Sequence, residues 1–126
     1  MTKYEELMAE FDDELIIEER PIKIDGLYCD GVTWIREDIP SNKKLCVLAE
    51  EIGHYLTSAG DILDLSSMDN ARQEHKARKW AYEKLLPKEK IIAALRTGAV
   101  HTWELAELLE VDEEFLVNAL IYYGIV

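Results

Sequence analysis

The stretch from Lys43 to Thr57 constrains the fold most, because its apolar residues recur at the spacing of an α-helix. The apolar stripe of this predicted helix consists of Leu45, Leu48, Ile52, Tyr55 and Leu56. The same stretch also contains Glu50, Glu51 and His54, in the order E-E-x-x-H. A helix with one apolar stripe must bury that stripe against other elements, so the segments around it should supply a core.

The segments before this helix predict a second helix and a small sheet. Residues 4–15 have apolar positions at helical spacing and predict an amphipathic helix that ends before Pro21. The sequence PIKIDGLYCDGVTWIRED then changes to short apolar runs and a period of two, interrupted by Asp-Gly pairs at 25–26 and 30–31. We expect an antiparallel sheet of two or three strands here.

The segments after this helix are helical. The polar stretch SAGDILDLSSMDN leads to a second long helix at about 70–86, closed by Pro87. Shorter helices are predicted at about 88–97, 102–109 and 112–123. The fold class is therefore α+β, a small antiparallel sheet on a mostly helical body with the two long helices side by side. The 126 residues form one domain, 1–126, with a helical C-terminal subregion at about 88–126.

Charge and composition exclude several classes of partner. The formal net charge of -12 argues against nucleic acid and anionic membranes, which need clustered Lys and Arg. Cys29 and Cys46 lack metal-ligand spacing and fit reduced thiols in a cytoplasmic protein. The N-terminus has no signal-peptide pattern, and no run of about 18 apolar residues would cross a membrane.

The E-E-x-x-H stretch has the spacing of a metal site. Glu50 and His54 are one helical turn apart, and Glu51 lies on the flank where H-E-x-x-H proteins place a general base. Zinc accepts carboxylate oxygen, so Glu50 can take the place of the first histidine. The alternative for these three residues is a solvated polar helix face.

A third ligand is expected from the second long helix. Glu74 falls within a stripe of alanine and leucine side chains, and a buried carboxylate needs a positive partner. A metal ion held by Glu50 and His54 would be such a partner. A salt bridge with Arg78 is the alternative.

Three motifs in sequence resemble the ImmA/IrrE family of metallopeptidase-like proteins, especially versions encoded by phages and mobile elements. The family pattern L-A-H-E-x-G-H corresponds to LAEEIGH at 48–54. Its helix E-x-x-A-x-x-F-A-x-x-L-L-x-P is matched by Glu74, by the segment 77–86 with Trp80 at the aromatic position, and by Pro87. The segment ELAELLEVDEEFLVNALIYYG completes the resemblance.

The resemblance implies a site and a function. It makes His54 and Glu74 metal ligands, Glu51 the general base, and Glu50 the substitute for the family's first histidine. The implied cofactor is Zn²⁺, or Mn²⁺ or another divalent ion, and the Glu50 exchange leaves open whether a metal is retained. The implied activity is a metallopeptidase, a hydrolase that acts in the cytoplasm on a transcriptional repressor. The alternative is a catalytically inactive protein-interaction module that keeps the fold.

The C-terminal segment resembles a degenerate helix-turn-helix. Its recognition-helix position reads DEEFLVNALIYYG, with three acidic residues and no Lys or Arg, so it cannot neutralise phosphates. We expect a helical unit that covers the domain or binds a protein, with Trp103, Phe115 and Tyr122 as core or contact residues. His75 and His101 are expected at the surface.

Overall fold

The computed structural model describes residues 1–58 and 67–125, which form six helices and three strands. In chain order these are α1 (Lys3–Phe11), β1 (Ile16–Arg20), β2 (Gly26–Cys29), β3 (Val32–Arg36), α2 (Ser41–Ser58), α3 (Ser67–Leu85), α4 (Lys88–Leu95), α5 (Thr102–Leu109) and α6 (Glu113–Tyr122). The predicted α+β class is confirmed. The polar stretch between the long helices lies partly outside the described residues, and its last residues belong to α3.

The sheet is mixed, which corrects the expectation of a purely antiparallel one. Its strand order is β1-β3-β2, with β1 parallel and β2 antiparallel to β3. β2 and β3 form the predicted hairpin, whose two turn residues, Asp30 and Gly31, both have positive φ, 47° and 85°. That conformation matches the twist of the flanking strands and explains the Asp-Gly pair.

Strand β1 was expected to be the end of the first helix. The helix instead ends at Phe11, and Leu15 turns back into the core while the following residues pair with β3. Ile16 and Ile17 are β-branched and favour a strand over a helix. Pairing with a strand 16 positions later (Ile16 with Val32) is a long-range contact that local periodicity does not reveal.

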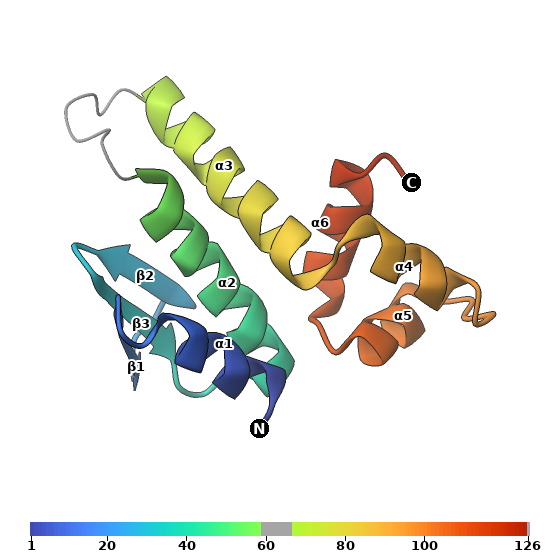
Figure 1. Cartoon of the computed structure of the whole chain (residues 1–126), viewed down its shortest axis with the longest axis horizontal. Helices are drawn as coiled ribbons and strands as arrows, with labels where there is room; N and C mark the ends of the chain where they lie inside the picture. The colour runs from blue at the N-terminus through green and yellow to red at the C-terminus, as the bar shows by residue number, and fades with distance from the viewer. Residues whose placement is uncertain (59–66, 126) are drawn as a thin grey trace.

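Figure 1 shows how the elements are arranged around the two long helices. The sheet and α1 lie beside α2, and α4, α5 and α6 gather around the C-terminal end of α3, away from the sheet. One core cluster runs through all of these parts, and it includes Leu7, Ile35, Leu48, Leu86 and Leu116.

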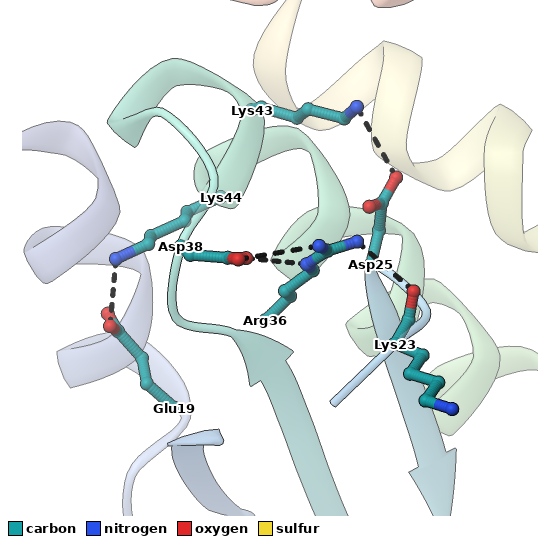
Figure 2. Close-up of polar contacts among 7 residues, drawn as sticks. All are labelled: Glu19, Lys23, Asp25, Arg36, Asp38, Lys43 and Lys44. Atoms are coloured by element: carbon teal, nitrogen blue, oxygen red, sulfur yellow. Dashed lines mark hydrogen bonds and ion pairs between the residues drawn. The ribbon is translucent and has the colours of Figure 1, made fainter. Parts of the chain in front are cut away.

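Ion pairs hold the first turn of α2 against the sheet (Figure 2). Lys44 Nζ lies 2.8 Å from Glu19 Oε1 on β1, and Lys43 Nζ lies 3.5 Å from Asp25 Oδ2, just before β2. Arg36, at the end of β3, pairs with Asp38 and donates to the carbonyl oxygen of Lys23 at 3.1 Å. Two ion pairs therefore join the first turn of α2 to β1 and to the residue before β2.

The aromatic residues of the C-terminal unit divide between core and surface. Phe115 is buried and packs edge-on against Tyr82 of α3, with ring centroids 5.2 Å apart. Tyr122 is half-buried beside the same Tyr82. Trp103 remains 53% exposed and stacks on His101. The unit thus covers the end of α3 and leaves several large apolar side chains in solvent, among them Trp103, Leu108 and Ile121.

A close approach of α2 to α3 places the residues of the candidate site. A Cβ atom on Gly53 would lie 2.4 Å from the carbonyl oxygen and 2.9 Å from the Cα atom of Ala77. These are backbone atoms of α3, so no rotation of a side chain could make room. Only glycine at position 53 allows the two helices to pack at this distance.

We predict that Gly53→Ala destabilises the protein, although Gly to Ala inside an exposed helix normally stabilises by about 1 kcal/mol. Forcing the helices apart should lower the free energy of unfolding by about 2 kcal/mol, as overpacking typically does. Urea denaturation measures the difference. The double variant Gly53→Ala/Ala77→Gly should not recover stability, because the clash is with backbone atoms. An increase in stability in Gly53→Ala would contradict the packing argument.

Candidate metal centre

Helix α2 presents Glu50, Glu51 and His54 from a well-packed scaffold. Its predicted apolar stripe is buried at Leu45, Leu48 and Ile52, whereas Tyr55 is half-buried and Leu56 is 40% exposed. Glu50, Glu51 and His54 are themselves half-buried. The three side chains therefore lie at the boundary between core and solvent, where a ligand can contact them.

Helix α3 brings Glu74 directly to His54. The Nε2 atom of His54 lies 3.0 Å from Oε2 of Glu74, and the two side chains are 24% and 40% exposed. Two of the four predicted site residues thus meet across the α2–α3 contact. They are 20 positions apart in the sequence (74 − 54 = 20). Glu74 does not point away into solvent, as a simple surface glutamate would.

The other oxygen of Glu74 faces a cation of its own helix. Arg78, one turn further along α3, places its Nε atom 3.4 Å from Oε1 of Glu74. One carboxylate is therefore shared between an imidazole and a guanidinium. Of the two partners that the sequence offered for Glu74, the salt bridge with Arg78 is present, and the metal ion held by Glu50 and His54 stays a prediction.

Glu50 lines a neighbouring cleft of about 250 Å³, together with Asp25, Arg78, Asp112 and Glu114. Burial raises the pKa of Glu50; the positive charge of Arg78 opposes this, and the carboxylates of Glu74, Glu114 and Asp25 add to it. Glu50 is thus an acid in an environment that disfavours a further negative charge. Sequence reasoning had not placed Asp25 or Glu114 near it.

Glu51 lies on the side of α2 that faces β2. A Cβ atom on Gly26, the first residue of β2, would lie 3.1 Å from Oε2 of Glu51. Burial, followed by repulsion from Glu50 and Glu74, raises the pKa of Glu51 to about 7. β2 is an edge strand, so this carboxyl group stands beside the open side of the sheet.

The donor atoms fit a divalent ion in their chemistry, and in their spacing for two of the three. Two carboxylates and an imidazole are all zinc ligands, and tetrahedral ligands with bonds of about 2.0 Å lie about 3.3 Å apart. The 3.0 Å between His54 and Glu74 is close to that separation. Across residues 1–58 and 67–125, however, no group of three or more His, Cys, Asp or Glu side chains is arranged to hold an ion. Ligation by Glu50, His54 and Glu74 therefore stays a prediction.

The remaining candidates lie where the sequence suggested. His75 and His101 are exposed. Cys29 is exposed and Cys46 buried, and neither forms a disulfide. Over the described part of the chain, no helix is long and apolar enough to cross a membrane.

The structure thus packs an E-E-x-x-H helix against a second helix that carries a glutamate. A family model described as the IrrE N-terminal-like domain, of peptidase family M78, matches residues 21–120. The chain belongs to this family, which confirms the ImmA/IrrE resemblance. Searches of curated proteins and of solved structures found no match.

We predict that the charge on Glu51 makes the metal-free protein less stable at high pH. The pKa of Glu51 is about 7 in the folded protein, above the ordinary 4.5, so its contribution to stability is complete below pH 4.5 and is lost as the pH rises to 7. Glu51→Gln removes this loss. In the presence of EDTA, the variant should gain about 2 kcal/mol relative to wild type between pH 5 and pH 8.

Thermal unfolding at both pH values measures this gain. Glu107→Gln, which removes one exposed carboxylate from α5, is the control for the change in net charge. An equal effect of the two substitutions at both pH values would show that the environment of Glu51 has no special influence.

Proposed function

We propose that the chain is a metal-dependent peptidase of the ImmA/IrrE type that acts in the cytoplasm on a regulatory, repressor-like protein. The observation that supports this most is the contact of His54 with Glu74 across the two long helices, with Glu51 on the adjoining face of α2. Membership of the family adds the expectation of a metallopeptidase.

The residues have separate roles in this proposal. Glu50, His54 and Glu74 would hold the ion, zinc or manganese. The bound ion would polarise the peptide carbonyl and make water a stronger acid. Glu51 would accept the proton of the attacking water on a carboxylate oxygen and return it to the leaving amine. Its place beside β2 puts this oxygen near the open edge of the sheet, where an extended peptide could reach it.

The expected partner is a protein. The net charge of -12 and the acidic start of α6, with Glu113 and Glu114 in its first turn, disfavour binding to a nucleic acid directly. A DNA-binding repressor is basic on its binding surface, and its charge would complement that of this chain.

A second candidate is an inactive module that keeps the fold and binds the same kind of partner without cutting it. The ion pair of Arg78 with Glu74 favours this candidate, because it supplies a positive charge to the carboxylate that a metal would otherwise neutralise. Glu50 in the histidine position favours it too, since a carboxylate ligand reduces the Lewis acidity of an ion.

We predict that Glu51→Gln abolishes cleavage of a repressor-like protein encoded beside this chain, and leaves metal binding unchanged. The amide cannot accept a proton, and losing a general base typically reduces the rate by about 10²- to 10⁴-fold. Cleavage is followed by gel electrophoresis and mass spectrometry, with zinc and manganese each added to metal-free protein. Glu107→Gln should cut as wild type does. If wild type binds the partner but does not cut it with either metal, the inactive module is the better description.

We predict that Glu50→His increases the affinity for zinc, because it restores the H-E-x-x-H ligand set. With two carboxylates and one imidazole the ligands carry -2 and cancel the charge of Zn²⁺, whereas two imidazoles and one carboxylate leave +1 on the centre. Activity, where present, should rise with occupancy. Titration against a competing chelator measures the affinity. Equal or weaker binding would mean that Glu50 is a ligand around which the site is built or no ligand at all, and Glu50→Ala separates these two cases.

A further inference from the structure

We propose that Arg78 is an internal cation that competes with the metal ion for Glu74 and thereby sets the metal affinity of the site. This inference rests on the proposed ligand set, and it goes beyond that set by assigning a function to a residue outside it. Arg78 is not part of the E-E-x-x-H motif and is not one of the proposed ligands.

The carboxylate of Glu74 contacts two different groups. The guanidinium of Arg78 lies 3.4 Å from Oε1 of Glu74, while Oε2 of the same carboxylate is 3.0 Å from His54. Both oxygens of the glutamate therefore have partners. An ion that binds Glu74 must share this carboxylate with Arg78 or displace it, and two cations on one carboxylate repel each other.

The site is rich in negative charge. Glu74 lies at the α2–α3 contact, and Glu50 lines a cleft with further carboxylates, Asp25, Asp112 and Glu114. Arg78 is close to both Glu74 and Glu50, since it contacts Glu74 and lines the same cleft as Glu50. In the metal-free protein, Arg78 therefore neutralises part of the negative charge that a divalent ion would neutralise.

The side chain of Arg78 has room to move away from Glu74. Its side chain is 52% exposed, and Arg78 lies on the surface of α3 next to the buried Ala77. Displacement by an ion would move the guanidinium into solvent or toward the cleft without disturbing the packing of α2 on α3. The exchange of one cation for another therefore needs no change of fold.

These arguments also explain why the donor set is incomplete. The two cations favour different arrangements of the same acids: Arg78 draws Glu74 along its own helix, whereas an ion would draw Glu50, His54 and Glu74 to one point. Among the described residues no three such donors converge, while the Glu74 carboxylate contacts both His54 and Arg78.

The test compares Arg78→Gln with Lys79→Gln. Both remove one positive charge from an exposed position on α3, but no contact joins Lys79 to Glu74, so it is the matched control. Zinc affinity is measured by titration of metal-free protein against a chelating dye. We expect Arg78→Gln to bind zinc about tenfold more tightly than wild type, in the usual range of a coupling between two competing ligands, and Lys79→Gln to match wild type.

Stability without metal provides a second measurement. In EDTA, Arg78→Gln should melt at a lower temperature than wild type and Lys79→Gln, because Glu74 and Glu50 lose their nearby cation, and added zinc should restore most of the difference. Arg78→Lys keeps the charge but not the planar group, so its zinc affinity should lie between those of wild type and Arg78→Gln.

The outcomes separate this inference from the proposed function. Equal zinc affinity in wild type, Arg78→Gln and Lys79→Gln overturns the inference and leaves the peptidase proposal standing if wild type cuts its partner. Tighter binding in Arg78→Gln with no cleavage by any variant supports the inference and overturns the peptidase. If neither wild type nor Arg78→Gln binds zinc, competition for a metal is refuted.

Discussion

The contact between α2 and α3 is the constraint on which the candidate site depends. Gly53 allows the backbone of α2 to approach that of Ala77, and this distance is what lets His54 reach Glu74. A bulkier residue at position 53 would increase the separation of the helices, and the histidine and the glutamate would no longer touch. The contact between His54 and Glu74 therefore depends on Gly53, which has no functional group.

Electrostatics impose the second constraint, since the packing collects acids that repel one another. Half-burial beside Glu74 raises the pKa values of Glu50 and Glu51. A nearby cation would stabilise their ionised forms. The protein offers Arg78 for this purpose, and the family relationship suggests a metal ion. The question of enzyme or binding module thus reduces to which cation these carboxylates hold.

Much of the architecture could be predicted because it is encoded locally. The apolar period located α2 and α5 to within two residues, and the Asp-Gly pair at 30–31 located the hairpin turn. The place of Glu74 among alanines indicated that it faces α2. Each of these predictions depends on neighbours within one or two turns of the same element.

The remainder could not be predicted because it depends on distant partners. Strand β1 becomes a strand only by pairing with β3, and its direction makes the sheet mixed. The proximity of Glu51 to Gly26 depends on how α2 packs on the sheet. The Asp-Gly pair at 25–26 predicted only a turn, and it gave no information about this packing. The same is true of Asp25 and Glu114 in the cleft beside Glu50.

The contact between His54 and Glu74 also depends on the position of α3 along α2. Sliding α3 by a single residue would move Glu74 by about 1.5 Å along the axis and rotate it by about 100°, which is enough to break a contact of 3.0 Å. The C-terminal end of α3 packs against α6 through Tyr82 and Phe115. A displacement of the C-terminal helices along the axis of α3 would therefore move Glu74 relative to His54 and break their contact.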